Sequence, residues 1–240
     1  MAGATTVLNS EAVERIGLDQ PQWLRDRRTH AWHVYEHTPM PTIRLEEWRY
    51  TNLKKKLDLD SLRLSDDEVL SSEATTWPDR LRAAMDEDRE ASGHIVIIDG
   101  RVVHTDVDES LAAQGVILES LHDAVTNHEE LVREHLATEA VPPEAGKFEA
   151  LNAALWVDGI FLYVPKGVQF DRPVRVTRWI SNAGMAYFCR VLIVAESQSQ
   201  VSYVDEVLSD DLESQTYAST AVELIARDGA QVQYVAVQRL

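Results

Sequence analysis

The stretch LYVPKGVQF at residues 162–170 has a counterpart in IVAESQSQV at residues 193–201 and a second one in LIARDGAQV at residues 224–232. Successive copies are offset by 31 residues. Each copy contains the apolar end of a strand, a four-residue polar corner, and a glutamine plus an apolar residue that begin the next strand. Self-similarity at a fixed period is typical of stacked β-units, each of which buries its apolar face against a neighbour. The sequence therefore predicts a stack of strands, unfinished at Leu240.

Further segments rich in Val, Ile and Tyr predict the remaining strands of this part. They cover residues 173–180, 186–195, 200–208, 220–226 and 231–238, with a polar insertion at 209–216. Gln169, Gln200 and Gln231 occupy the same position in the three copies, so their amides either stack as a ladder or coincide by chance.

The first part of the chain has mainly helical patterns. A helix is expected after Pro21, and Thr38-Pro39 ends it because proline disfavours a continuing helix. Other helices are expected from the capping box at Ser65–Glu68, from Thr76 towards Glu90, from Ser120 to about Thr138, and over 147–155. Asp99-Gly100 between apolar runs predicts a tight β-hairpin, and residues 115–118 predict another strand. The expected fold class is α+β, with a helical and small α/β region before a mainly β part.

Charge is distributed unevenly along the chain. The formal net charge is −17, of which residues 1–150 carry −14 and residues 151–240 carry −3. This shift, with the proline-rich segment 141–146, predicts two domains at 1–146 and 147–240. So acidic a chain is a poor partner for nucleic acid. A single cysteine, no visible signal peptide and no long apolar segment indicate a cytoplasmic protein without a membrane span.

Catalytic motifs are largely missing. The sequence has no G-x-G-x-x-G, no P-loop lysine motif and no nucleophile elbow. Asp205, Glu206 and the run Asp210-Asp211-Leu212-Glu213 are either the carboxylates of a carbohydrate-active β-helix enzyme or a solubilising loop. The loop is the favoured interpretation.

Two groups of histidines are candidate metal ligands. His30, His33 and His37 recur at one face of the first long helix, which suits either a metal site or a solvated face. His94 and His104 flank the hairpin, but counting from its turn places His104 opposite Ile95 and His94 opposite Thr105, so they do not pair. We assign no catalytic, cofactor or metal residue.

Cys189 is expected to be a buried thiol. It alternates with Tyr187, Val191 and Ile193 on one face of its strand, whereas Arg190 points to the other face. A nucleophile or cluster ligand is the alternative.

Two blocks resemble the SufB/SufD family of iron–sulfur assembly proteins. The first is Glu46-Glu47-Trp48-Arg49-Tyr50-Thr51-Asn52-Leu53 after Pro39-Met40-Pro41. The second starts with Phe148–Leu155 and continues through Asp158-Gly159, Val164–Val168 and Pro173-Val174. The resemblance covers residues 21–240, and the Trp-Arg-Tyr-Thr block favours the SufD branch over SufB.

The resemblance implies a non-enzymatic scaffold with a right-handed parallel β-helix. It implies pairing with a SufB homologue and, through helices beyond residue 240, with a SufC ATPase homologue. The family residues tied to cluster handling also lie beyond residue 240, so we expect no cofactor within the chain, and the cluster or iron to be handled by the full complex. The last strand, residues 231–238, is expected to expose an edge through which the chain self-associates.

Overall fold

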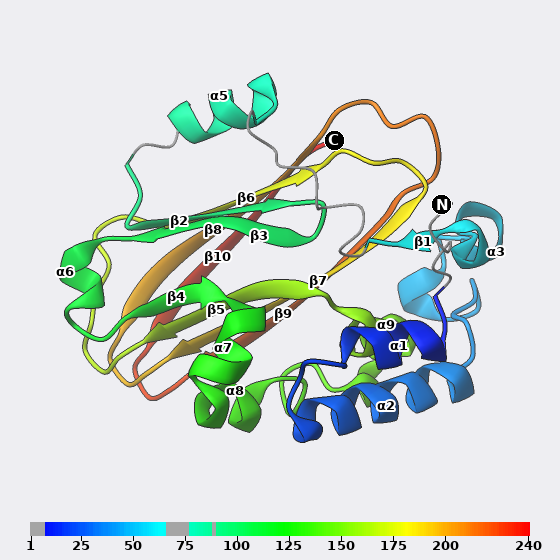
Figure 1. The fold of residues 1–240 in the computed structure, drawn as a ribbon, viewed down its shortest axis with the longest axis horizontal. Helices are drawn as coiled ribbons and strands as arrows, with labels where there is room; N and C mark the ends of the chain where they lie inside the picture. Colours follow the sequence, from blue (N-terminus) through cyan, green and yellow to red (C-terminus); the bar gives the residue numbers. More distant parts are fainter. Residues whose placement is uncertain (1–7, 66–76, 88–89) are drawn as a thin grey trace.

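The computed structural model describes residues 8–65, 77–87 and 90–240. Helices dominate its first part, and strands dominate the rest (Figure 1). The helices are α1 (Ser10–Ile16), α2 (Gln22–His37), α3 (Leu53–Lys56), α5 (Asp79–Glu87), α6 (Glu109–Ala112), α7 (Leu121–Asn127), α8 (Glu129–His135) and α9 (Lys147–Leu155), with 3-10 turns η1 (Glu46–Trp48), η2 (Leu59–Ser61) and η3 (Pro143–Ala145). The strands are β1 (Arg63–Leu64), β2 (Gly93–Ile98), β3 (Arg101–Val107), β4 (Ile117–Ser120), β5 (Asp158–Val164), β6 (Val174–Ile180), β7 (Met185–Ala195), β8 (Gln200–Ser209), β9 (Tyr217–Ala226) and β10 (Gln231–Arg239).

The expected α+β class is confirmed, with the strands arranged in two mixed sheets. Sheet A joins β4, β5, β7 and β9, and β1 pairs with the start of β7. Sheet B has the order β10-β8-β6-β2-β3. From β5 onward the chain alternates between the sheets, and each strand pairs in parallel with the one two positions later. Antiparallel pairs occur only in the earlier part among the described strands, at β2–β3 and β4–β5.

The repeat found in the sequence matches the pairing register of β5–β7, β7–β9 and β8–β10, whereas in β6–β8 Val174 pairs with Tyr203, 29 residues later. Leu162 pairs with Ile193 and Ile193 with Leu224 in sheet A. In sheet B Gln200 pairs with Gln231. Each of the last three pairs is separated by 31 residues, the period of the sequence repeat. The predicted stacking of the strands is therefore confirmed.

The polar corners of the repeat also stack. The sixth residue of each copy has a positive φ: Gly167 at 74°, Gln198 at 62° and Gly229 at 72°. The Gly167 N–H donates to the carbonyl of Ser197 in the next copy (3.0 Å), and the Gln198 N–H donates to that of Asp228 (3.0 Å). Glycine fits this left-handed conformation without a Cβ penalty, which explains why two of the three copies carry it.

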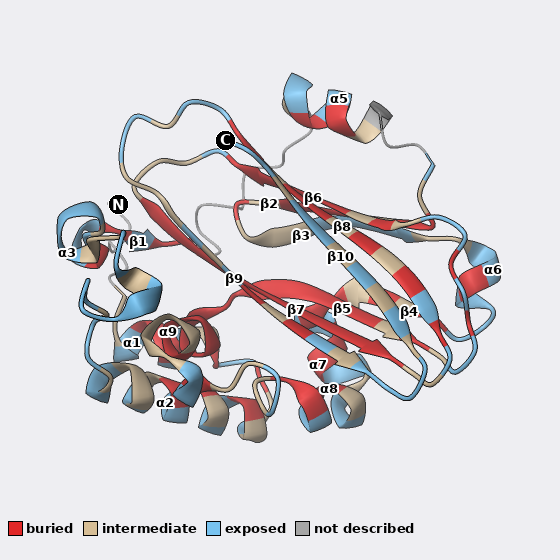
Figure 2. Cartoon of the chain, turned by 180° about the vertical axis from the view of Figure 1, so that it is seen from behind, coloured by how far each residue is buried: buried red, intermediate tan, exposed pale blue. Residues whose placement is uncertain are grey.

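The molecule has layers, and sheet A lies in the middle (Figures 1 and 2). Helices α1, α2, α7, α8 and α9 lie on one side of sheet A, and sheet B lies on the other side, with α5 beyond it (Figure 1). Every residue of β7 is buried, because β7 is covered on both faces (Figure 2). Strands covered in this way have continuous apolar runs rather than alternating patterns.

Three of the four apolar clusters found among the described residues show how these layers are filled. The first cluster lies between the helices and sheet A and includes Leu24, Leu151 and Phe188. The two sheets enclose a second, which includes Leu162 of β5, Val191 of β7 and Tyr203 of β8. The third joins Leu81 of α5 to Trp179 and Leu208 of sheet B.

Local sequence signals set the bounds of the helices. Asn9 caps α1, because its side chain accepts a hydrogen bond from the Ala12 N–H (2.9 Å). Helix α2 begins after Pro21 and ends at His37, before Thr38-Pro39, as predicted. Helix α9 spans the predicted residues 147–155. The capping box expected at Ser65–Glu68 extends outside the described residues. No helix among the described residues has both the length and the apolar character needed to cross a bilayer.

The helix expected from Ser120 to about Thr138 is two helices. Ser120 caps α7 as predicted, since its hydroxyl accepts from the Asp123 N–H (3.3 Å). His128 then leaves the helical conformation (φ −133°, ψ 43°), and α8 follows. The His128 ring contacts Glu119 at the end of β4 (3.1 Å), so a tertiary contact accompanies the break.

The predicted hairpin forms at Asp99-Gly100, both with positive φ, but its predicted register was wrong. Beyond Ile97 a β-bulge shifts the pairing by one residue. His104 consequently pairs with Val96 rather than Ile95, and His94 with Asp106 rather than Thr105. An extra residue in one strand cannot be counted from the turn alone. The conclusion that the two histidines do not pair is confirmed.

Candidate functional site

A buried ion pair lies between the two sheets. Arg178 of β6 donates from Nη2 to Oδ2 of Asp205 on β8 (2.6 Å), and both side chains are buried. The Tyr234 hydroxyl of β10 donates to the same carboxylate oxygen (2.7 Å). Arg178 also contacts the Thr220 hydroxyl of β9. One arginine thus links strands of both sheets.

The acidic candidates of the sequence therefore separate into two kinds. Asp205 is held by Arg178 and Tyr234, and buried Glu206 contacts Nε of Arg239 (2.8 Å). The interpretation of these two as solvated residues was wrong. Asp210, Asp211 and Glu213 lie on the insertion between β8 and β9, and Asp210 and Asp211 are exposed, as expected of a solubilising loop. A cleft of about 790 Å³ between β9 and β10 is lined by Asp205, Asp210 and Asp211, among others.

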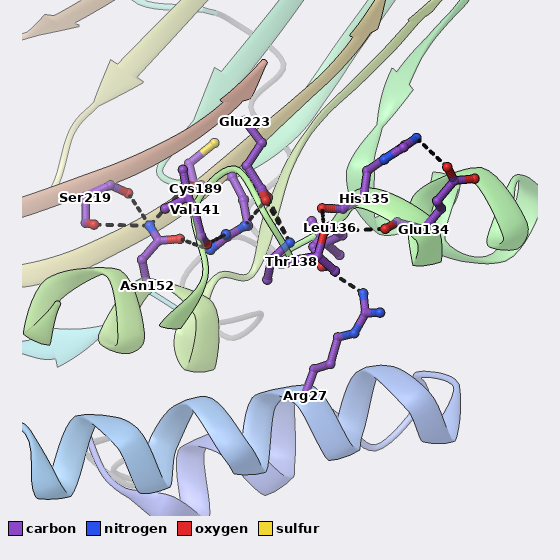
Figure 3. A network of polar contacts seen from close by, with 12 residues as sticks. Arg27, Glu134, His135, Leu136, Thr138, Val141, Asn152, Cys189, Ser219 and Glu223 are labelled. Atoms are coloured by element: carbon purple, nitrogen blue, oxygen red, sulfur yellow. Dashed lines mark hydrogen bonds and ion pairs between the residues drawn. The ribbon is translucent and has the colours of Figure 1, made fainter. Parts of the chain in front are cut away.

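A second buried ion pair joins sheet A to the helical layer (Figure 3). Nε of Arg190 on β7 lies 2.6 Å from Oε1 of Glu223 on β9, and neither side chain is exposed to solvent. The Ala137 N–H donates to Glu223 Oε2 (2.8 Å). Arg190 donates from Nη2 to the Val141 carbonyl (2.6 Å) and from Nη1 to Asn152 Oδ1 (3.3 Å).

Asn152 extends this network to the backbone of sheet A. Its amide nitrogen donates to the carbonyls of Cys189 (3.1 Å) and Ser219 (3.2 Å), as Figure 3 shows. The network therefore fixes α9 and the segment 137–141 against β7 and β9. Its position explains a polar residue in the buried second half of helix α9, which the sequence interpretation did not use.

Asp158 is a third buried polar centre, at the start of β5. Its carboxylate accepts from the Ser120 hydroxyl (2.8 Å), from the Val102 N–H (3.0 Å) and from the His122 N–H (3.3 Å). It also accepts from the N–H of Gly159 (2.7 Å). Four donors compensate the burial of the charged group. Asp158 thereby ties β3 and the start of α7 to sheet A.

The three histidines of α2 do not form one cluster. Nε2 of His30 lies 2.6 Å from Oε1 of Glu144, and this contact lowers the pKa of Glu144. His33 and His37 instead lie beside Glu36 on the same exposed turn, with their ring centroids 4.0 Å apart. The sequence interpretation missed the Glu36 carboxylate next to the histidines, although His-x-x-Glu-His is a known zinc-binding motif.

Cys189 is buried between the sheets, as predicted, and Arg190 points to the opposite face. Burial raises the pKa of its thiol to about 11. Gln169, Gln200 and Gln231 lie in register, so their backbone alignment is real, while no amide contact joins them among the described residues.

We expect Cys189 to resist alkylation by iodoacetamide at pH 8 in the native protein and to react at once in guanidinium chloride. The thiolate is the reactive species, and burial disfavours it. Because the folded pKa is raised, the thiol's contribution to stability is complete below about pH 9 and is lost as the pH rises towards 11. Mass spectrometry measures the labelling; native labelling as fast as denatured labelling would contradict a buried thiol.

These features define a mixed α and β protein in which parallel strands stack in register and buried ion pairs join the layers. Residues 6–176 match the SufBD protein N-terminal region, and residues 178–240 match the SufBD core domain of SUF system FeS cluster assembly. The chain belongs to the SufBD family.

Characterised relatives carry both names of the family. The chain is 30% identical over 240 residues to the iron–sulfur cluster assembly protein SufB of Bacillus subtilis, covering 96% of this chain and 50% of the relative. It is 33% identical over 224 residues to SufD of the same species, covering 92% and 49%. A SufBD family protein of Staphylococcus epidermidis is 30% identical over 232 residues, covering 92% and 48%. The chain thus spans about half the length of these relatives.

Proteins of this family are non-catalytic scaffold components of iron–sulfur cluster assembly, in agreement with the prediction that the chain is not an enzyme. The alternative of a carbohydrate-active enzyme is not supported, and Asp205, its first candidate carboxylate, is held in an ion pair. SufB and SufD match about equally well, so the comparisons show the family but do not distinguish its SufB branch from its SufD branch.

Proposed function

We propose that the protein is a SufD-like scaffold subunit for iron–sulfur cluster assembly. The observation that carries the scaffold role is the stack of parallel strands, in which β5–β7, β7–β9 and β8–β10 share a 31-residue register, because such a stack is rigid and presents long faces to partners. The SufD branch rests on the block Glu46–Leu53. There Trp48 packs against Phe148 of α9 (ring centroids 5.4 Å), and the Tyr50 side chain is 87% exposed.

The proposed β-domain is a right-handed parallel β-helix that begins in residues 147–240, after a helical and α/β region over 1–146. Two observations favour it: consecutive strands from β5 alternate between the sheets, and their corners bond from one copy to the next. The buried pair of Arg178 and Asp205 lies inside this stack, where it would hold successive turns together.

The proposed partners are a SufB homologue and a SufC ATPase homologue, in the cytoplasm, with the cluster or iron as cargo of the complex rather than a cofactor of this chain. Co-expression of the complete protein with both homologues tests this assignment. We expect a complex that remains intact through affinity and size-exclusion chromatography. Failure of the complete protein to retain either homologue would refute the proposal.

We further propose that residues 1–240, expressed by themselves, self-associate through β10, an edge that further strands of the proposed β-helix would cover in a longer chain. Among the described strands β10 pairs only with β8, so its other edge offers unpaired N–H and C=O groups. Light scattering over a concentration series is expected to show dimers. Val235→Lys on β10 should reduce them, because an edge lysine opposes strand pairing.

Val103→Lys is the matched control for this experiment. Val103 lies on β3, the opposite edge strand of sheet B, and is 47% exposed against 39% for Val235. The control should dimerise like the unmodified chain. A strictly monomeric chain at every concentration, or equal effects of the two lysines, would contradict association through β10.

A further inference from the structure

The last turn of α2 carries three side chains able to share one cation. His33, Glu36 and His37 lie at positions i, i+3 and i+4 of the helix, so they project from one face. Each offers a ligand atom, and these atoms all lie within 4.8 Å of one another. From this arrangement we propose that His33, Glu36 and His37 form a surface site for a late first-row divalent cation, Zn²⁺ in the first instance.

The distances are close to those of a loaded site. Zinc–nitrogen and zinc–oxygen bonds are about 2.0–2.2 Å long, so two ligands of one ion lie at most about 4.4 Å apart. All three side chains are exposed, and exposed side chains change rotamer within nanoseconds. Small rotations of side chains therefore complete the site, and the helix backbone does not have to move.

One of the imidazoles is already oriented for binding. Nδ1 of His37 lies 2.7 Å from the carbonyl oxygen of His33, to which it donates as the Nδ1–H tautomer. This bond leaves the Nε2 lone pair of His37 for a metal. Histidine ligands in metal sites commonly donate their other ring nitrogen to a carbonyl in this way.

The electrostatic setting also favours a cation. Helix α2 spans 16 residues and ends at His37, so the site lies at the negative end of the helix dipole. Glu36 adds a carboxylate, which in the described part of the chain makes no ion pair within 4 Å, although its charge partly offsets the burial that lowers the pKa of Lys147. His30 differs, because Glu144 already occupies its Nε2. The third histidine of the helix is therefore outside the site.

The donor set indicates the class of metal. Two imidazoles and one carboxylate suit zinc, copper or nickel, whereas Mg²⁺ and Ca²⁺ prefer sites made of oxygen atoms. Three protein ligands leave at least one coordination position open, for water or for a donor from another molecule. The site differs in this from closed structural zinc sites, which use four protein ligands.

Isothermal titration of Zn²⁺ into the metal-free protein tests the proposal. We expect one ion per chain. His33→Ala and His37→Ala should each weaken binding by at least about tenfold, the lower end of the range found when only the outer-shell partners of metal ligands are removed. Glu36→Gln should weaken it as well. His30→Ala is the matched control from the same helix face, and it should bind Zn²⁺ like the unmodified protein.

Imidazole ¹H–¹⁵N spectra supply a second measurement that does not depend on affinity. Zn²⁺ should shift the ring signals of His33 and His37 and leave those of His30 in place. Because all four substituted side chains lie at the surface, circular dichroism is expected to show unchanged folding. Absence of binding, or binding that His33→Ala and His37→Ala leave unaltered, would overturn the proposal.

Discussion

Replacement of Arg190 by methionine is expected to lower the free energy of unfolding by about 3–5 kcal/mol, because it leaves the carboxylate of Glu223 buried without its partner. Neither side chain of the pair is exposed, and their charged atoms lie 2.6 Å apart. Arg190 also donates to the Val141 carbonyl and to Asn152, so the substitution removes contacts between sheet A and the helical layer. Urea unfolding followed by circular dichroism measures the loss.

Two further variants show how much of the loss in stability comes from burial of the ion pair and how much from the unpaired charge. Arg172→Met removes an exposed ion pair with Asp108 (3.2 Å) and should cost less than about 1 kcal/mol. The double variant Arg190→Met/Glu223→Leu should recover part of the loss, because an apolar pair of similar volume avoids the unpaired charge. A single-variant loss as small as that of Arg172→Met would show that the buried pair contributes little.

The stacked part of the fold could be predicted from the sequence because its signal is periodic. The offset between Leu162, Ile193 and Leu224 in the sequence is also their offset in sheet A. Such a repeat carries information about pairing between strands, which a local propensity does not. The bulge in the hairpin after Asp99-Gly100 has no such signal, and the predicted register there was off by one residue.

Burial of charge was the least predictable property. Asp205 and Glu206 look like surface residues in the sequence, because acidic side chains are mostly exposed in proteins. Their burial depends on Arg178 and Arg239, which come from other strands. Arg190 was assigned to the correct face of β7, but only the layer of helices over that face shows that it is buried. Residues distant in sequence decided each case.

The histidines of α2 show the same limit at the surface. Helical spacing correctly grouped His30, His33 and His37 on a solvated face. It could not show that Glu144, from the turn η3, contacts His30. Glu36 is local, and the sequence contained the information that places it beside His33 and His37.

Gly159→Ala is expected to destabilise the protein by about 3 kcal/mol or more, at the upper end of the range for overpacked cores. A Cβ at this position would lie 1.8 Å from the carbonyl oxygen of Arg190 and 2.8 Å from its carbonyl carbon. These are backbone atoms of β7, so no side-chain rotation relieves the contact. The strand itself would have to move, and the bonds of Arg190 to Glu223 and Val141 resist that movement.

Gly167→Ala distinguishes this steric effect from the general cost of replacing glycine. Gly167 has a φ of 74°, and an added Cβ would meet no atom within 4 Å. Its substitution should therefore cost only the left-handed backbone conformation, about 1–2 kcal/mol. Urea unfolding of both variants, with hydrogen exchange of the β5 and β7 amides, measures the difference. A smaller loss for Gly159→Ala than for Gly167→Ala would mean that β5 and β7 separate easily, and that the close approach of the two strands does not require glycine.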